Sequence, residues 1–273
     1  MSSVSINPKP APQLSDEERS GFERAGWVGV YPLLSGDEVR RACALRDQVL
    51  PRITSPREVT QATDLQTFER RPWFKSMHAL VPEYHEVASH PAIVGRVASL
   101  LGPDLIAWGL TLTRSAPGGV HRWHVDIEHM HWPGVSVYIG LENNDLDSTL
   151  KVLEGSQRVG ARPQAFGVKD DDGALATVRS KVPDAKVLRV PVRPGEFFLF
   201  HGQLWHASHN TGGNIRVAMI IHYSRPDARV RIPLNFDDPI LWHPWQPPCV
   251  LVSGHDRHGV NRLVGRPEPL PPA

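Results

Sequence analysis

The stretch PGEFFLFHGQLWHASHNTGGNIR, residues 194–216, shows the pattern of strands and turns that indicates the fold class. An apolar strand begins after a turn at Gly195, and His206 lies just past the end of that strand. A Gly-rich hairpin follows, and a returning strand places Arg216 ten positions after His206. Apolar strands joined through Gly- and Asn-rich turns indicate antiparallel β structure.

The same pattern runs through the chain from residue 104 onward. Short β-branched or aromatic runs alternate with clusters of Gly, Pro, Asn and Asp, which is typical of an antiparallel barrel or jelly roll. The runs are DLIAWGLTLT (104–113), VSVYIGLE (135–142), TLKVLEG (149–155), KVLRVPV (186–192), GEFFLFHG (195–202) and NIRVAMIIHYS (214–224). We therefore expect a mainly β fold with flanking N-terminal helices around a double-stranded β-helix, the cupin-like jelly roll. No internal repeat is visible, which argues against a propeller or solenoid.

Helices are expected before this core. Ser15 and Ser35 are each followed three residues later by a Glu, the capping-box signature of a helix start. The expected elements are a helix to about Ala25, a strand at 27–34, and helices at about 36–50 and 83–101.

The chain divides into an arm and one domain. Residues 1–14 are rich in Pro and predict a flexible or surface-bound arm. Residues 15–273 predict a single domain, with a helical part at about 15–103, a jelly-roll core at about 104–224 and a Pro/Trp-rich extension at about 225–273. The extension looks too irregular for a core strand, and it is either a lid over the barrel mouth or a surface tail.

Composition excludes several classes of function. Thirty basic and 29 acidic residues leave a formal charge of +1, and no basic run interleaves with aromatics, so nucleic acid is not expected as a partner. No apolar run approaches the roughly 18 residues of a membrane span, and no apolar stretch follows the first charges, so we expect a cytoplasmic protein. Cys43 and Cys249 lack the spacing of a disulfide framework or zinc site. Nothing in the sequence indicates the oligomeric state.

A metal site is indicated by His124-Val125-Asp126, the one His-x-Asp among 14 histidines. In an extended segment, residues i and i+2 share a face, so both side chains can reach one cation. With His206, two imidazoles and a carboxylate leave three positions open on an octahedral ion, as in non-haem Fe(II) oxygenases. A 2-oxo acid takes two of the open positions and O2 takes the third. The planar guanidinium of Arg216 can bind the far carboxylate of 2-oxoglutarate through two hydrogen bonds.

Other residues near these segments leave alternatives open. Five further histidines could replace a ligand, line the pocket, orient the ligands or face solvent: His121, His129, His131, His201 and His209. Three tryptophans flank the site and are either pocket or core aromatics: Trp123, Trp132 and Trp205. Our candidate pocket residues are His129, His131, Trp132 and Trp205. A basic cluster, Arg70, Arg71 and Lys75, either meets an anionic substrate group or lies on a solvated surface.

Four segments together resemble the phytanoyl-CoA dioxygenase superfamily of Fe(II)/2-oxoglutarate oxygenases over most of the chain. They are FERAGWVGVYPLLSGDEVRRA (22–42), HRWHVD (121–126), STLKVLEGSQRVG (148–160) and the stretch at 194–216. The resemblance implies that His124, Asp126 and His206 bind the iron and that Arg216 anchors the C5 carboxylate of 2-oxoglutarate, assisted by Ser208. Thr111 or Thr113 could also touch the cosubstrate.

The chain departs from the family pattern at two places. Gly155-Ser156-Gln157 stands where the family commonly has Gly-Ser-His, and Tyr138 stands where a Trp is usual. Neither position belongs to the implied iron ligands, so the departures concern the substrate and not the reaction.

The resemblance implies a dioxygenase that uses Fe(II), 2-oxoglutarate and O2, and that releases succinate and CO2. Halogenating relatives lack the carboxylate and place chloride in its position, so Asp126 favours hydroxylation of a C–H bond. The expected substrate is a small molecule: a secondary metabolite, an amino acid or a sugar-containing metabolite.

Two other functions compete with this one. A cupin-like Zn or Mn hydrolase or isomerase could use the same three ligands, but it leaves Arg216 unexplained. A catalytically silent sugar- or peptide-binding jelly roll would need no complete triad.

Overall fold

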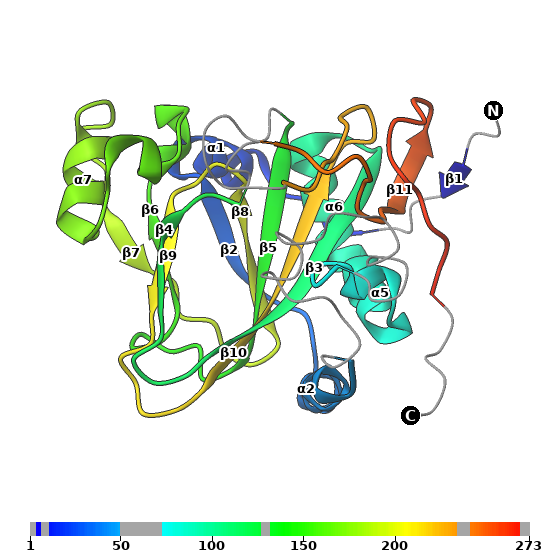
Figure 1. The fold of residues 1–273 in the computed structure, drawn as a ribbon, viewed down its shortest axis with the longest axis horizontal. Helices are drawn as coiled ribbons and strands as arrows, with labels where there is room; N and C mark the ends of the chain where they lie inside the picture. The colour runs from blue at the N-terminus through cyan, green and yellow to red at the C-terminus, as the bar shows by residue number, and fades with distance from the viewer. Residues whose placement is uncertain (1–3, 7–10, 50–72, 127–131, 234–240, 268–273) are drawn as a thin grey trace.

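The computed structural model describes residues 4–6, 11–49, 73–126, 132–233 and 241–267. Two antiparallel sheets make up the body of the protein, with helices packed against the larger one (Figure 1). This arrangement confirms the expected jelly roll with flanking N-terminal helices. Within these residues, no helix has both the length and the apolar character needed to cross a membrane.

The larger sheet has seven strands in the order β1-β11-β3-β10-β5-β8-β2. Their bounds are β1 Val4–Ile6, β2 Trp27–Pro32, β3 Leu105–Ser115, β5 Gly134–Glu142, β8 Glu196–His201, β10 Arg216–Ser224 and β11 Val250–Asp256. The smaller sheet has the order β4-β9-β6-β7. Its strands are β4 Val120–His124, β6 Leu150–Leu153, β7 Val187–Arg189 and β9 His206–His209. Neighbouring strands pair antiparallel in both sheets.

The α-helices are α1 Asp16–Ala25, α2 Gly36–Val49, α5 Pro82–Ala88, α6 Pro91–Leu101 and α7 Asp171–Arg179. Short 3-10 turns lie at η2 Met77–Ala79, η3 Ser156–Val159 and η4 Pro163–Phe166. The capping box of α1 is present: the Ser15 side chain accepts from the Glu18 amide at 3.2 Å, and the Glu18 carboxylate accepts from the Ser15 amide at 2.8 Å. Gly26 ends this helix in the left-handed conformation, with φ 85°.

The single helix expected at 83–101 is wrong. Two helices occupy this range, because α5 ends at Ala88 and α6 begins at Pro91. Proline has no amide hydrogen, and its ring clashes with the carbonyl of the preceding turn, so it starts a helix more readily than it continues one. The His90 side chain caps the second helix by accepting from the Ala92 amide at 3.1 Å.

Strand alternation divides β10 between two environments. One face of the strand packs into the main core against apolar side chains of α2, α5 and α6. This face carries Val217, Met219, Ile221 and Tyr223. The opposite face therefore points toward the interior between the two sheets, and it carries Arg216, Ala218, Ile220 and His222. Reactive groups on this inner face are shielded from water by the two sheets.

The C-terminal extension does contain a core strand, so the expectation that it was too irregular for one is wrong. β11 pairs with β3 on one side and with β1 on the other. Val250 and Val252 pack into the main core, while Leu251 packs into a second cluster around Trp108. The strand is buried on both faces, which removes the alternation that would have revealed it among the prolines and tryptophans. Within the expected arm, Val4–Ile6 form β1.

Candidate metal centre

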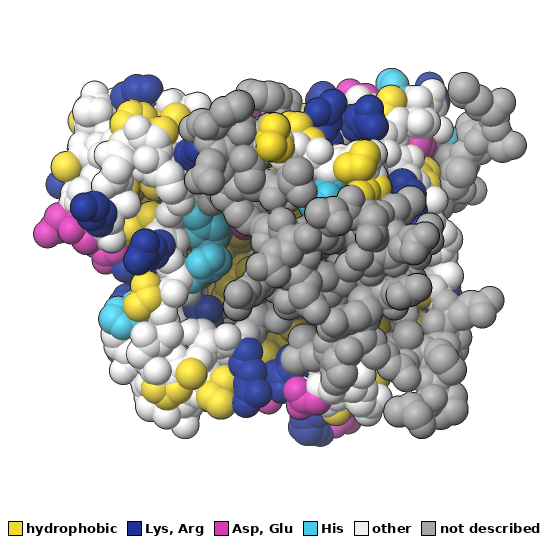
Figure 2. Space-filling model, viewed as in Figure 1, with side chains coloured by type: hydrophobic (Ala, Val, Ile, Leu, Met, Phe, Trp, Pro, Cys, Tyr) yellow, Lys and Arg dark blue, Asp and Glu magenta, His cyan; other side chains and the backbone are white. Residues whose placement is uncertain are grey.

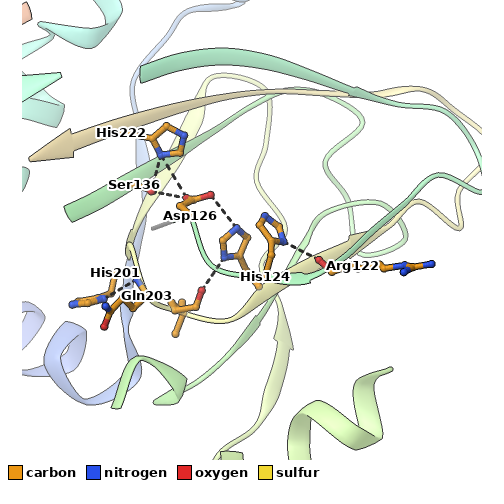
Figure 3. A network of polar contacts seen from close by, with 9 residues as sticks. Arg122, His124, Asp126, Ser136, His201, Gln203 and His222 are labelled. Atoms are coloured by element: carbon orange, nitrogen blue, oxygen red, sulfur yellow. Dashed lines mark hydrogen bonds and ion pairs between the residues drawn. The ribbon is translucent and has the colours of Figure 1, made fainter. Parts of the chain in front are cut away.

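The structure brings together His124, Asp126 and His206. One ligand atom from each residue lies within 4.8 Å of the ligand atoms of the other two. His124 ends β4 and His206 begins β9, and the two residues are partners across these strands. Asp126 follows in the turn just after β4, so the short His-x-Asp spacing brings its carboxylate back to the imidazoles (Figure 3).

Backbone carbonyls fix the orientation of both imidazoles. His124 Nδ1 lies 2.8 Å from the Arg122 carbonyl, and His206 Nδ1 lies 2.8 Å from the Leu204 carbonyl (Figure 3). A carbonyl oxygen can only accept a hydrogen bond, so each Nδ1 carries the hydrogen and each Nε2 keeps its lone pair for a metal. Such a partner on the far nitrogen is the usual support of a metal-binding His.

Two groups contact the carboxylate of Asp126 through Oδ2. The hydroxyl of Ser136 donates to Oδ2 at 2.6 Å, and His222 Nδ1 lies 3.6 Å from the same oxygen (Figure 3). The other oxygen, Oδ1, lies 3.4 Å from His206 Nε2. Oδ1 therefore faces the His206 imidazole.

Burial and neighbouring charges set the protonation states of the site. Burial lowers the pKa of His124 well below its usual value, and His206 and His121 lower it further. Burial alone would raise the pKa of Asp126, but His206 and His222 outweigh it and hold that pKa well below its ordinary range. At neutral pH the site thus offers a neutral imidazole at His124 and a carboxylate at Asp126, the forms that bind a divalent cation.

A β-bulge explains why His121 lies on the same side of β4 as His124. The pairing of β4 with β9 shifts register between His121 and His124, and the rings of these two residues lie 4.0 Å apart. Burial lowers the pKa of His121 to about 4, with His206 contributing. His121 lies beside the three candidate ligands and is not one of them.

The remaining histidines considered as alternatives lie elsewhere or are not described. His201 accepts a hydrogen bond from the Gln203 amide at 3.0 Å, and its ring lies beside Phe22. His209 ends β9 opposite Val120. His129 and His131 lie outside the described residues, as do Arg70 and Arg71 of the basic cluster.

Arg216 is a buried cation at the start of β10, with 4% of its surface exposed. Its Nη1 donates to the Ser148 carbonyl at 2.8 Å, and its buried Nε has no hydrogen-bond partner. The ion pairs recorded among the described residues do not include Arg216. A buried guanidinium without a carboxylate is costly, so the geometry fits an anionic ligand at this position.

Tyr138 lies in the electrostatic field of Arg216. Burial raises the pKa of Tyr138 to about 12, against the opposing effect of the Arg216 charge. Its hydroxyl donates to Asn144 Oδ1 at 2.6 Å, and Asn144 in turn donates to the Val217 carbonyl at 2.7 Å. Tyr138 is thus held in place by Asn144.

Three other candidates lie on the inner faces. Thr111 and Thr113 on β3 are opposite Ile220 and Ala218 of β10, whose side chains point inward. Ser208 on β9 is buried and pairs with His121.

The flanking tryptophans belong to apolar clusters. Trp205 packs with Trp123 and Val125, and its indole donates to the Ala161 carbonyl at 2.8 Å. Trp132 packs edge-on against Trp108 in another cluster. Of the two interpretations left open for these residues, the packing favours core aromatics.

Reasoning from the sequence missed Ser136 and His222, which contact Asp126. Strand alternation could have found them. His222 is six residues after Arg216 on one strand, and Ser136 is two residues before Tyr138 on its neighbour. Both spacings are even, so each pair shares a face.

Figure 2 shows His side chains on the wall of a recess beside the smaller sheet, with hydrophobic side chains at its floor. Two imidazoles and one carboxylate at such a place, with a buried Arg nearby, are the donor set expected of a mononuclear non-haem iron enzyme built on a jelly roll. The donor atoms fit Fe(II), and the unpartnered Nε of Arg216 fits the cosubstrate's carboxylate.

Comparison with known proteins gives the family. The model of the phytanoyl-CoA dioxygenase (PhyH) family matches residues 22–218, and the chain belongs to this family. It is therefore a non-haem Fe(II)- and 2-oxoglutarate-dependent oxygenase that uses Fe(II), 2-oxoglutarate and O2 and acts on small molecules. No curated protein matches the sequence in a direct search.

Solved structures share the fold. The non-haem monooxygenase ThoJ in its apo form is 24% identical with a TM-score of 0.63, covering 92% of this chain and 88% of that one. CytC3 with Fe(II) and α-ketoglutarate is 20% identical with a TM-score of 0.61, covering 96% and 100%. The α-ketoglutarate-dependent carbocyclase SnoK from nogalamycin biosynthesis is 22% identical with a TM-score of 0.57, covering 82% and 89%. At these identities the matches establish the fold alone.

Proposed function

We propose that this enzyme hydroxylates an unactivated C–H bond of a small molecule, with succinate and CO2 as co-products. The observation that supports it most is the complete set of three donors, His124, Asp126 and His206, within 4.8 Å of one another. Because Asp126 supplies the third protein ligand, no position is vacated for a halide. This favours hydroxylation over halogenation.

Each residue has a distinct task in this proposal. His124, Asp126 and His206 hold the iron, and Arg216 binds the C5 carboxylate of 2-oxoglutarate through a charge-assisted fork. Iron, when bound, supplies the oxidising chemistry. Ser208, Thr111, Thr113 and Tyr138 surround the cosubstrate as positioning groups. The inner faces of the two sheets exclude water from the reacting atoms.

The substrate class we propose is a secondary metabolite, an amino acid or a sugar-containing metabolite. A fold shared with a carbocyclase of nogalamycin biosynthesis agrees with a biosynthetic role. We propose one domain from residue 15 onward, and the cytoplasmic location stays a prediction.

Isotope labelling tests the reaction. The protein is incubated with Fe(II), 2-oxoglutarate, ¹⁸O2 and a panel of candidate small molecules, and products are examined by mass spectrometry. Hydroxylation predicts one labelled oxygen in the product and one in succinate. Succinate that gains the label beside an unlabelled, desaturated or cyclised product would contradict hydroxylation and keep the oxygenase class. The Asp126→Ala protein is the control, and it should form neither labelled compound.

A further inference from the structure

A second row of polar contacts lies behind Asp126, on two strands of the larger sheet. Ser136 on β5 and His222 on β10 are cross-strand partners, and both side chains point inward. The Ser136 hydroxyl contacts Asp126 Oδ2 at 2.6 Å and His222 Nδ1 at 3.0 Å (Figure 3). All three side chains are nearly inaccessible to solvent. The contacts form one chain from the imidazole to the carboxylate.

The direction of these hydrogen bonds follows from their chemistry. An ionised carboxylate can only accept, so the Ser136 hydroxyl must donate its hydrogen to Asp126. The Ser136 oxygen is then free to accept, and His222 Nδ1–H is the donor that faces it. An imidazole can supply this hydrogen in its neutral form as well as in its protonated form. A neutral imidazole carries one hydrogen, and the geometry places it on Nδ1.

The ring of His222 is itself held rigidly. It stacks on Trp108, with centroids 4.7 Å apart and planes inclined by 19°. On β3 the register with β10 shifts between His222 and Tyr223, which leaves Trp108 as the extra residue of a bulge. The ring also packs closely against Gly109 of β3, since a Cβ built there would lie 3.0 Å from His222 Cδ2.

We propose that Ser136 and His222 are positioning residues that hold Asp126 so that it binds the metal through Oδ1 alone. The inference rests on the metal centre of the proposed function. Oδ2 is occupied by the Ser136 hydroxyl, whereas Oδ1 lies 3.4 Å from His206 Nε2 and faces that imidazole. A carboxylate that binds through one oxygen leaves three positions of an octahedral ion open. Without the hydroxyl, Asp126 can turn and bind through both oxygens, which takes a position that 2-oxoglutarate and O2 require.

Cobalt binding tests this without catalysis. The full-length apo protein is titrated with Co(II) alone, and the visible d–d bands report affinity and coordination number. Ser136→Ala should lower the Co(II) affinity by about 10- to 100-fold, as expected for a partner that orients a ligand, and should change the bands. Ser136→Thr keeps the hydroxyl and should restore both. Ser253→Ala, a buried serine on β11, is the matched control and should behave like the parent.

The His222→Phe variant tests the contribution of the imidazole to Co(II) binding separately from that of the Ser136 hydroxyl. It keeps an aromatic ring against Trp108 and removes the N–H, so it should weaken Co(II) binding less than Ser136→Ala. Because His222 acts through Ser136, adding His222→Phe to Ser136→Ala should change little more. If His222→Phe fails to fold, the Ser136 pair alone decides the question.

Two outcomes would overturn the inference, and they differ in what they say of the function. Ser136→Ala with unchanged Co(II) affinity and bands, beside a parent that binds Co(II), contradicts the positioning role and leaves the metal centre standing. A parent that binds no Co(II) contradicts the metal centre and the inference together.

Discussion

His124 and His206 face each other across β4 and β9, with ring centroids 4.1 Å apart. His124 comes from the segment HRWHVD and His206 from the stretch at residues 194–216. Pairing of these two strands, and not the local sequence at either residue, assembles the candidate metal centre. The register of the smaller sheet is therefore a functional property as well as a structural one.

Asp126→Ala should abolish turnover while leaving the fold intact. The change removes the one anionic donor of the three, and nothing else among the candidate ligands can replace its charge. Turnover is measured as succinate release, and folding as the thermal midpoint. Asp172→Ala, on the exposed side of α7, is the control and should retain activity. Normal succinate release from Asp126→Ala would remove this residue from the site.

Arg216→Lys should weaken the binding of 2-oxoglutarate. Lys keeps the positive charge but presents a point charge in place of a planar fork. From the ~1.5–3 kcal/mol of a hydrogen bond to a charged group, the apparent affinity should fall roughly 10- to 100-fold. The KM for 2-oxoglutarate measures this. Arg114→Lys, an exposed position on β3, serves as the matched variant, and equal KM values for the two variants would contradict the assignment.

Acid should destabilise the protein partly through His78. Burial lowers the pKa of His78 to about 4, whereas an unfolded His titrates near 6.5. Between these values the unfolded chain binds a proton that the native chain does not, so stability is present above about pH 6.5 and is lost as pH falls. One such group contributes at most about 1.4 kcal/mol per pH unit. In urea unfolding experiments from pH 7 to 4, the free energy of unfolding should fall less steeply in His78→Gln than in the parent. Equal pH dependence in the two proteins would refute the contribution of His78.

Gly195→Ala should destabilise the fold. Gly195 has φ +85°, which disfavours side chains, and a Cβ there would collide with the Leu34 carbonyl. Its own carbonyl accepts from the Leu33 and Leu34 amides, each at 2.9 Å, so the turn cannot simply move away. We expect a loss of about 1 kcal/mol or more in the free energy of unfolding.

Gly21→Ala gives the matched comparison for this glycine. Gly21 lies within α1, and no atom lies within 4 Å of a Cβ built there. Alanine should stabilise the helix by about 0.5–1 kcal/mol. Chemical denaturation of both variants measures whether the free energy of unfolding falls in Gly195→Ala and rises in Gly21→Ala. An unchanged free energy of unfolding in Gly195→Ala would show that the turn relaxes freely.

Local signals in the sequence predicted local structure well. The capping box at Ser15 and Glu18 specifies a helix start without help from distant residues, and it is present. The His-x-Asp pair is equally local, since two residues of backbone bring both side chains to one place. Its partner His206 lies some 80 residues away, and it was predicted from the strand, hairpin and Arg216 pattern at residues 194–216 together with the family resemblance.

Other features depend on tertiary packing and were not predictable in the same way. β11 is buried on both faces, so its sequence shows no alternation. Trp108 and His121 owe their direction to β-bulges, which change the face of a side chain without any mark in the sequence. His222 and Ser136 became recognisable as partners of Asp126 only once the register of β5 and β10 was known.

We propose that His124, Asp126 and His206 hold an Fe(II) ion that 2-oxoglutarate chelates. The most direct test is to add both to the apo protein without oxygen and to record the visible spectrum. A weak metal-to-ligand charge-transfer band in the parent, absent in His124→Ala, is the predicted result. Fe(II) that binds without giving the band, or a band unchanged in His124→Ala, would contradict the account.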